Sequence, residues 1–264
     1  MKICSFNVNS IRARKDLILA WLDHRKNDID ILCFQELKTV NEGFPYEDFK
    51  RLGYQCLVYG QKAYNGVAIC TKITPDNSSK GFGIENLDDQ KRIIAAKING
   101  IHLINIYVPH GGLRGEDKFD YKQEWYKNFI EYLNARYSPQ DPIVILGDFN
   151  VAYEDIDVYS PDEMAGTIGV LPEERTAFKK LLDWKLIDAF RYLYPDKIQF
   201  TWWNYIGGAI WNDKGLRIDY ILGTRTLLKK LKYIEVDLWP RKRRNPTPSD
   251  HAPLIAELDI IEDK

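Results

Sequence analysis

Short apolar segments rich in β-branched residues recur along the chain with turn residues between them, a pattern typical of β-strands. These segments are residues 2–7, 29–34, 54–59, 66–71, 92–98, 101–108, 142–148, 217–222, 233–238 and 253–260. Asn99-Gly100 separates two of them and is a strong signal for a two-residue β-hairpin. Residues 77–83 are polar and contain glycine, so they are expected to form a loop.

Three amphipathic stretches, at about 15–26, 121–137 and 173–185, predict helices between the strands. The second of them carries a stripe of large apolar side chains at helical spacing, which indicates a face turned toward the core. That stripe consists of Trp125, Phe129, Tyr132 and Leu133. Pro172, followed by two acidic residues, suits the start of the third helix.

Strands outnumber helices in this pattern, and hairpins alternate with helical crossovers. We therefore predict an α/β fold in which two mixed, mostly antiparallel sheets pack face to face with helices on the outside. No stretch has the composition of a linker, so residues 1–264 are expected to form a single domain.

The composition is that of an ordinary globular protein, with 45% hydrophobic and 28% charged residues. No apolar run approaches the roughly 20 residues that a membrane-spanning helix needs. The first ten residues are expected to form a strand and lack the pattern of a secretory signal, which predicts a cytoplasmic protein without a membrane partner. The net charge of −1 does not indicate a polyanionic partner, and the basic run 241–244 alone is more typical of a solvated surface.

The four cysteines lie far apart in the sequence, each within an apolar stretch. They are Cys4, Cys33, Cys56 and Cys70. Their spacing matches no zinc-ligand pattern, so we expect buried free thiols.

Polar side chains collect where the predicted strands begin or end. They are Asn7, Glu36, Tyr107, Asp148, Asn150, Asp219, Asp250 and His251. Each has an ordinary alternative, because Asp or Asn after a strand is more often a turn or cap residue and a single histidine is more often structural. In combination, at the ends of strands that must pack together, they predict one functional site.

These residue types suit the hydrolysis of a phosphodiester, which requires a hard cation, a positioned water and donors to the phosphate oxygens. Magnesium prefers carboxylate ligands, so Glu36 is the first candidate for a metal ligand and Asp250 the second. Asp148 and Asn150, two residues apart on a segment expected to be extended, are candidates for holding the nucleophilic water. The sequence contains neither a GxSxG nucleophile elbow nor a P-loop, so acyl transfer and P-loop nucleotide hydrolysis have no support.

Three further side chains are predicted to act on the same phosphate. His251 would donate to a phosphate oxygen if a carboxylate holds its other ring nitrogen, and Asp219 is our candidate for that carboxylate. Tyr107 would add a phenolic donor.

Six short motifs occur in the order known from one enzyme family. They are SFNVNSIRAR, CFQELKT, IYVPHG, GDFNVA, GLRIDYIL and SDHAP, accompanied by YGQKAYNGVAICTK, GVLPEER and TWWNY. In these motifs the chain resembles the bacterial type of the exonuclease III family of apurinic/apyrimidinic (AP) endonucleases, over residues 1 to about 258. The resemblance implies a four-layer α/β sandwich and a hydrolase that depends on Mg²⁺, with Mn²⁺ as the alternative ion. It also implies cleavage of double-stranded DNA 5′ to abasic sites and processing of 3′ ends.

The same resemblance implies a role for each matching position. Glu36 corresponds to the principal metal ligand, with Asn9 and Asp250 near the ion. Asn7, Asn150 and Asp148 correspond to residues around the scissile phosphate, with Asp148 activating the water. Tyr107 and His251 correspond to phosphate contacts, and Asp219 corresponds to the partner of that histidine.

Three positions depart from the family pattern: His110, Asn9 and Leu216. His110 stands where related enzymes commonly have Asn or Gln, and we expect it still to donate to phosphate. The metal-proximal Asn9 is an amide, as in bacterial members, where animal-type members have Asp; one charge fewer suggests a single, weakly held ion.

The resemblance also implies an aromatic slot for the abasic sugar. Trp202 corresponds to its aromatic wall, and Leu216 and Ile218 are expected to complete it; Leu216 stands where animal-type enzymes have Trp. Adjacent residues on a strand point to opposite faces, so Trp203 is expected to lie in the core. A slot that rejects an intact base would select the lesion.

Basic residues on loops are expected to contact DNA phosphates, and the basic run 241–244 is equally compatible with a solvated surface. The main candidates for these contacts are Arg12, Lys38 and Arg114. Two alternatives remain open from the sequence. One is a phosphatase or phosphodiesterase of the same superfamily that acts on a small or lipid phosphate, and the other is a non-catalytic nucleic-acid-binding protein. A monomer is the default expectation.

Overall fold

The first of two six-stranded sheets is built from both ends of the chain. In the computed structural model, which describes residues 1–260, its strands are β1 (Lys2–Asn7), β2 (Ile31–Gln35), β3 (Gln55–Tyr59), β4 (Val67–Thr71), β13 (Leu231–Val236) and β14 (Leu254–Leu258). Their order in the sheet is β13-β14-β1-β2-β4-β3. Only β1 and β2 are parallel neighbours, and the helix α1 (Ile11–His24) connects them.

The second sheet uses the middle of the chain and has the same size. Its strands are β5 (Asn77–Lys80), β6 (Ile93–Ile98), β7 (Ile101–Tyr107), β8 (Ile143–Asp148), β9 (Leu186–Asp188) and β12 (Asp219–Thr224). Their order is β5-β6-β7-β8-β12-β9. Again one central pair, β7 and β8, is parallel and is connected by a helix, α4 (Asp117–Arg136). A short ribbon of β10 (Trp202–Trp203) and β11 (Gly215–Leu216) lies beside this sheet.

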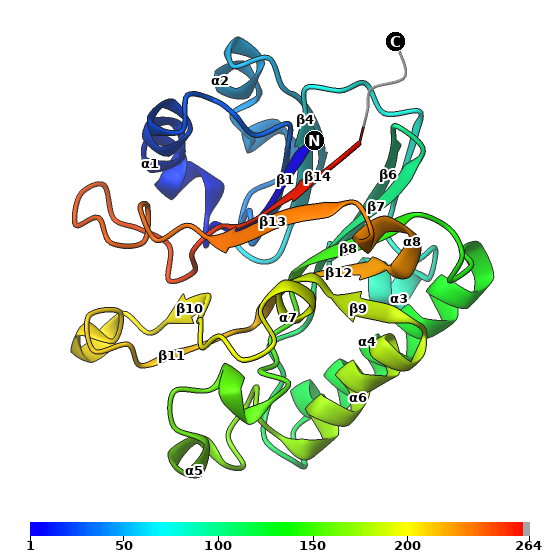
Figure 1. Cartoon of the computed structure of the whole chain (residues 1–264), viewed down its shortest axis with the longest axis vertical. Coiled ribbons are helices and arrows are strands. Elements are labelled where there is room, and N and C mark those ends of the chain that lie inside the picture. Colours follow the sequence, from blue (N-terminus) through cyan, green and yellow to red (C-terminus); the bar gives the residue numbers. More distant parts are fainter. Residues whose placement is uncertain (261–264) are drawn as a thin grey trace.

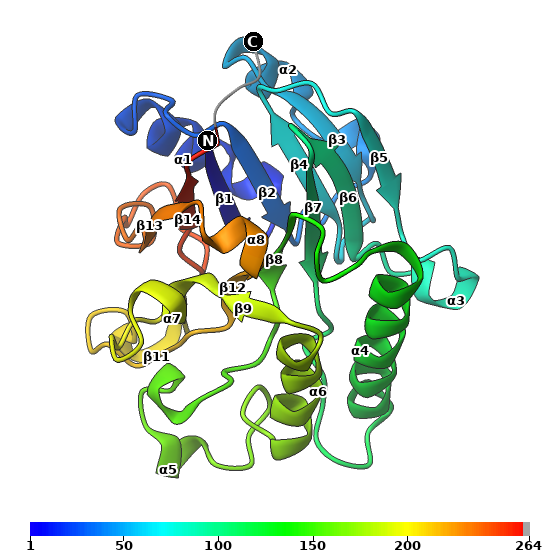
Figure 2. The same cartoon turned by 45° about the vertical axis from the view of Figure 1, so that its right-hand side comes forward.

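Helices cover the outer faces of the sheets (Figures 1 and 2). α1 and α2 (Tyr46–Arg51) cover the first sheet, and α4 and α6 (Pro172–Asp183) cover the second. The remaining helices are α3 (Glu85–Asp88), α5 (Pro161–Met164), α7 (Ala189–Leu193) and α8 (Arg225–Leu228), of which α7 and α8 pack against the core between the sheets. Three short 3-10 helices occur at Asn41–Gly43, Asp155–Asp157 and Ile206–Gly208. None of the helices in residues 1–260 has the length and apolarity to cross a bilayer.

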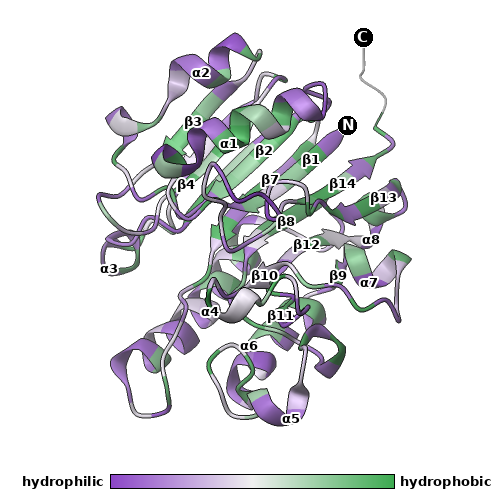
Figure 3. Ribbon diagram, turned by 90° about the vertical axis from the view of Figure 1, so that its left-hand side faces the viewer, coloured by the Kyte–Doolittle hydropathy of each residue, from purple (hydrophilic) through white to green (hydrophobic). Residues whose placement is uncertain are grey.

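Three apolar layers hold these elements together. Between the sheets, Ile31 and Ile69 of the first sheet share a cluster with Leu103 and Leu146 of the second. A second cluster joins α1 and α2 to the first sheet, and a third joins α4 and α6 to the second sheet. The order helix, sheet, sheet, helix confirms the predicted four-layer α/β sandwich. Figure 3 shows the matching distribution, with central strands such as β2 largely hydrophobic and α5 largely hydrophilic.

All ten predicted strands and all three predicted helices are present. Asn99 and Gly100 both have positive φ (48° and 73°) and connect β6 to β7, as the hairpin signal predicted. The loop predicted for 77–83 is wrong at Asn77–Lys80, which form the edge strand β5. Within residues 1–260 this strand pairs only with β6, and three of its four side chains are exposed, so its sequence lacks the apolar alternation of the other strands.

The prediction of four free thiols is wrong for two cysteines. Cys56 and Cys70 form a disulfide across the paired strands β3 and β4, where they are direct neighbours in the register. Cys4 and Cys33 are free and buried as expected. The chain separation of 14 residues carried no sign of this pairing, because only the strand register brings the two cysteines together.

A small set of buried amides crosses between the sheets. The Gln35 side-chain amide donates to Asn105 Oδ1 at 2.7 Å. Asn105 in turn donates to the backbone carbonyls of Phe34 (3.0 Å) and Ala68 (2.9 Å) in the opposite sheet. Because Glu36 follows Gln35 directly, this contact fixes the end of β2 relative to β7.

Candidate active site

The predicted polar residues meet at one rim of the sandwich, where β1, β2, β7 and β8 end and β12 and β14 begin. A cavity of about 220 Å³ opens there. It is lined by Glu36, Tyr107, His110, Asn150, Met164, Ile168, Gly169, Trp202, Leu216, Ile218, Asp250 and His251. Side chains from six strand ends thus converge, as the strand-end pattern predicted.

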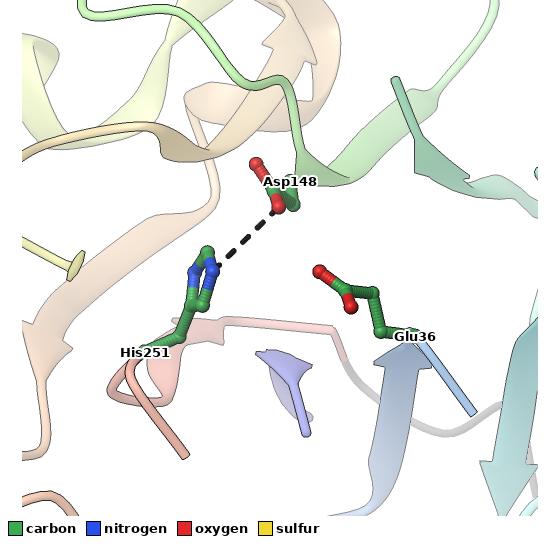
Figure 4. Close-up of side chains that lie close together, drawn as sticks. All are labelled: Glu36, Asp148 and His251. Carbon is green, nitrogen blue, oxygen red and sulfur yellow. Dashed lines mark ion pairs between the residues drawn. The ribbon is translucent and has the colours of Figure 1, made fainter. Parts of the chain in front are cut away.

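Asn7 connects the two central carboxylates of the site. Its side-chain amide donates to Glu36 Oε1 and to Asp148 Oδ2, at 2.9 Å in both cases. Asn7 ends β1 and Asp148 ends β8, so this contact also joins the two sheets at the rim. Figure 4 shows the Glu36 and Asp148 carboxylates and the His251 ring turned toward a common space.

His251 and Asp219 form the pair that the sequence predicted. His251 Nδ1 lies 2.9 Å from Asp219 Oδ2, while Nε2 faces Asp148 Oδ2 at 3.7 Å. Burial lowers the pKa of His251, but the Asp219 and Asp148 carboxylates outweigh it and raise the pKa to about 10. The ring is therefore a cationic donor at neutral pH.

Asp148 is buried at the centre of the site. Burial raises its pKa to about 7 despite the opposing effect of His251, and the Asp219 carboxylate adds to the rise. The Asn150 backbone N–H donates to Asp148 Oδ1 at 2.8 Å. The preceding Gly147 has φ 147°, and a Cβ there would lie 1.9 Å from the Ile106 carbonyl oxygen. Only glycine allows β8 this close approach to β7 beside the carboxylate.

The segment after β8 is not extended, contrary to the prediction for Asp148 and Asn150. Asn150 has φ 51° in the left-handed region, and its side-chain amide donates to the Val108 carbonyl at 2.9 Å and to Asp148 Oδ2 at 3.3 Å. The two side chains do share one site, but a turn rather than strand periodicity brings them together. Glu36 (φ 53°) has the same unusual backbone. Such conformations gather at functional sites, where surrounding contacts hold them in place.

Two of the three residues predicted to lie near the metal, Glu36 and Asn9, contact the Lys38 ammonium. Lys38 Nζ lies 2.8 Å from Glu36 Oε2 and also donates to Asn9 Oδ1. Asn9 donates to Asp250 Oδ1 at 2.9 Å. Burial raises the pKa of Glu36, but Lys38 and the Asn7 amide outweigh it, so its pKa is lowered. Lys38 therefore points into the site in this structure, and its predicted contact with a DNA phosphate stays a prediction.

The donor set fits a divalent cation. Among residues 1–260, Glu36, Asp148 and His251 place ligand atoms within 4.8 Å of one another. Burial raises the pKa of Asp250, but its neighbours, His251 first, outweigh it and lower the pKa, so this carboxylate is ionised. Glu36 belongs to two sets of candidate ligands: the cluster with Asp148 and His251, and the set with Asn9 and Asp250 that was predicted from the sequence. Oxygen donors of this kind suit magnesium.

Tyr107 ends β7 and contributes a neutral phenol. Burial raises its pKa well above the usual value, and the Glu36 and Asp148 carboxylates add to this. The Arg92 guanidinium lies over its ring, 4.7 Å from the centroid. The hydroxyl therefore remains protonated and can act as a donor.

One side of the cavity is apolar. Trp202 lines it together with Leu216 and Ile218, whereas Trp203 is 1% exposed and packs in the core, as predicted from strand alternation. The Trp202 indole N–H donates to Asp250 Oδ2 at 3.0 Å, which ties this wall to the polar side of the site.

Sequence reasoning missed three lining residues between β8 and α6. They are Met164, Ile168 and Gly169. The motif GVLPEER, which begins at Gly169, belongs to the family pattern and was the available signal for this part of the wall.

The predicted DNA-contact residues have different surroundings. Arg12 is exposed on α1, and Arg114 is exposed but paired with Glu173 at 2.7 Å. Within the basic run, Lys242, Arg243 and Arg244 are exposed. Arg241 differs from them, because it is 5% exposed and donates to the backbone carbonyls of Trp203 and Asp250. It braces the segment before His251, so the two interpretations left open for the run, a solvated surface and a DNA contact, apply only to the other three residues.

Comparisons with known proteins agree with this architecture. Residues 4–251 match the Endonuclease/Exonuclease/phosphatase family. Exodeoxyribonuclease III of Haemophilus influenzae is 37% identical over 270 residues, covering 98% of this chain and 100% of the relative. The solved structure of an AP endonuclease from Archaeoglobus fulgidus has a TM-score of 0.93 at 39% identity, covering 98% of this chain and 100% of that one. The 3′ phosphatase NExo from Neisseria, bound to a product DNA hairpin, has a TM-score of 0.91 at 37% identity, with the same coverage.

Proposed function

Because this chain belongs to the exonuclease III group of the endonuclease/exonuclease/phosphatase family, we propose that it is a DNA-repair nuclease that cleaves the backbone 5′ to abasic sites and processes 3′ ends. The relatives are named as an exodeoxyribonuclease, an AP endonuclease and a 3′ phosphatase, and phosphoester hydrolysis in DNA is common to all three. The family predicted from the six motifs is thereby confirmed.

One observation carries the proposal: phosphate-directed polar groups and an apolar wall face the same cavity. Glu36, Tyr107 and His251 line one side, and Trp202, Leu216 and Ile218 line the other. A phosphatase for small, fully polar phosphates would not need that wall. A non-catalytic binding protein would not need a buried Asp148 carboxylate held by the Asn7 and Asn150 amides.

The chain's own residues supply the proton transfers and the charge stabilisation. Asp148 accepts a proton from the attacking water, a task suited to a carboxylate with a pKa close to the working pH. His251, held by Asp219, donates to a non-bridging phosphate oxygen. The Asn7 and Asn150 amides keep Asp148 in place, and the Tyr107 hydroxyl is a further donor.

The reaction is proposed to need a divalent metal ion, Mg²⁺ first and Mn²⁺ second. Glu36 would hold the ion, with Asp250 and Asn9 completing the donors. When bound, such an ion stabilises negative charge on the phosphate oxygens. The Lys38 ammonium lies beside the Glu36 carboxylate, so a positive charge is favourable at this position.

The apolar wall is proposed to select the abasic sugar, which is small because it lacks a base. Trp202→Ala should therefore reduce the preference for abasic over intact duplex by about tenfold, since apolar contacts in a specificity pocket differ by roughly that factor or more. The measurement is the ratio of kcat/KM values on the two substrates. Trp184→Ala is the matched control, because Trp184 lies outside the cavity and its indole N–H donates to Asn134 Oδ1 instead. An equal effect of Trp202→Ala on both substrates would count against the slot.

The exposed part of the basic run is proposed to contact DNA phosphates beside the site. Arg243 stacks over Trp239 at 3.9 Å and Lys242 lies 5.9 Å from the Trp211 ring, so both cations have defined positions next to the Asp250 segment. The triple variant Lys242→Ala/Arg243→Ala/Arg244→Ala should raise KM and flatten the dependence of binding on salt. The log–log slope should fall by about 0.9 for each phosphate that the variant no longer neutralises.

The exposed pair Lys229 and Lys230, which follows α8, is the control for this charge removal. Replacing both by alanine should leave the salt slope as it is in the wild type. An unchanged salt slope in the triple variant would mean that the basic run is exposed to solvent and does not contact DNA phosphates.

Several finer points belong to the proposal. We expect residues 1–264 to act as a single catalytic domain and as a monomer, and we expect the enzyme to work in the cytoplasm. Arg12, Lys38, Arg114 and His110 are proposed as additional phosphate contacts.

The deciding experiment uses a synthetic duplex with one abasic-site analogue. Incubation with Mg²⁺ should give a single cut 5′ to the lesion with a 3′-hydroxyl end, and EDTA should abolish it. Longer incubation should shorten 3′ ends. An uncut duplex, combined with hydrolysis of a small phosphate ester, would favour the superfamily phosphatase instead. Tight binding of the duplex without any cleavage would favour a binding protein.

A further inference from the structure

A buried ion pair lies directly behind the catalytic loops. Lys122 of α4 and Glu174 of α6 have fully buried side chains, and Lys122 Nζ lies 2.7 Å from Glu174 Oε1. Neither residue lines the cavity. Lysine and glutamate are rarely buried so completely, and a buried pair is not in itself a source of stability, so another reason for it is to be sought.

The contacts of this pair reach three separate loops. Lys122 Nζ also donates to the backbone carbonyls of Asn150 (2.7 Å) and His110 (3.2 Å), so all three ammonium protons are used. Glu174 Oε2 accepts from the backbone N–H groups of Gly169 (2.7 Å) and Leu171 (3.1 Å). Each of the three loops supplies a residue of the cavity wall: His110, Asn150 and Gly169.

The local sequence leaves room for the pair. At Gly111, where φ is +89°, an added Cβ would lie 2.8 Å from Lys122 Cδ and 3.2 Å from Glu174 Oε1. The Ala152 N–H donates to the Gly169 carbonyl at 2.7 Å, which links two of the loops a second time. The left-handed Asn150, whose amide contacts Asp148, is thus fixed through its own carbonyl by Lys122.

We propose that the Lys122–Glu174 pair is the positioning element of this active site: it holds the His110, Asn150 and Gly169 loops in register with one another without touching the substrate. The inference rests on the proposed nuclease function for its kinetic readout. A displacement of about 1 Å in a catalytic group can lower turnover by about 100-fold, so loss of this alignment should act on kcat rather than on DNA affinity.

The test distinguishes a pair that positions the three loops from a pair in which each residue only neutralises the buried charge of the other. Removing one partner leaves a buried charge, so a single variant can fail to fold. The double variant Lys122→Met/Glu174→Met removes both charges and keeps apolar volume. We expect its Tm to fall, because the His110 and Asn150 carbonyls and the Gly169 and Leu171 N–H groups lose their partners. We also expect kcat on the abasic duplex to fall about 10- to 100-fold and KM to change by less than about threefold. The control is Leu133→Ala, a core change in the same helix that should lower Tm without lowering kcat of the folded enzyme.

A second readout does not depend on activity. Amide hydrogen exchange in residues 108–116, 149–154 and 165–171 should be faster in the double variant than in the wild type and in Leu133→Ala. If the double variant folds with wild-type kcat, or if exchange in the three segments is unchanged, the pair is only structural and the proposal is wrong. If the wild type itself leaves the abasic duplex uncut, the proposed function fails, and hydrogen exchange alone decides the positioning role.

Discussion

Replacing Asp148 by asparagine is expected to lower kcat on an abasic duplex by about 10²- to 10⁴-fold, the range that a general base contributes. The amide keeps the size of the carboxylate and can still meet the Asn150 backbone, but it cannot take a proton from water. The affinity for DNA should change little, because Asp148 lies behind the phosphate donors and is 1% exposed. Single-turnover cleavage measures the first quantity, and fluorescence anisotropy with a labelled duplex measures the second.

Asp183→Asn is a suitable control for that variant. Asp183 is a carboxylate at the end of α6 that pairs only with Lys179 on the surface, at 2.7 Å, and its loss should leave both rate and affinity unchanged. If Asp148→Asn weakened DNA binding as much as it slowed cleavage, the carboxylate would have a role in assembling the site rather than in accepting a proton.

Replacing Glu36 by alanine is expected to raise the Mg²⁺ concentration needed for half-maximal cleavage by about tenfold or more, because the ion loses its main anionic donor. Thermal unfolding gives an independent measurement, since an ion that binds only the folded state raises Tm as its concentration increases. That rise should be present in the wild type and much smaller in Glu36→Ala. The metal-free Tm of the variant serves as its own reference.

Glu42→Ala provides the matched control for the metal experiments, because Glu42 is an exposed carboxylate six residues further along the chain. It should titrate like the wild type in both assays. An unchanged Mg²⁺ dependence of Glu36→Ala, in cleavage and in Tm, would show that another carboxylate holds the ion.

The strands and the polar residues at their ends were predictable because they follow local rules. Apolar runs bounded by turn residues identified β1, β7 and β8, and the residues that follow such runs, Asn7 and Asp148 among them, had to lie at a sheet edge. The pairing of His251 with Asp219 was predicted from chemistry, since a donor histidine needs a carboxylate on its second nitrogen.

The features that escaped prediction depend on contacts distant in sequence or on backbone geometry. The Cys56–Cys70 disulfide follows from strand register, and the turn at Asn150 follows from hydrogen bonds to Asp148 and Val108. Lys122 looked like one more polar position on an amphipathic helix. Only the packing of α4 against α6 shows that it is fully buried.

The amide contact between Gln35 and Asn105 has a consequence for how faithfully the rim is assembled. Sliding one sheet past the other by a residue would break all three contacts of the Asn105 amide, with Gln35, Phe34 and Ala68, in a water-free interior, at about 1–3 kcal/mol for each unpartnered group. An apolar interface alone tolerates such a slip much more easily. These buried amide contacts therefore keep the two sheets aligned, and with them the residues that each sheet contributes to the active site, at a place that DNA does not reach.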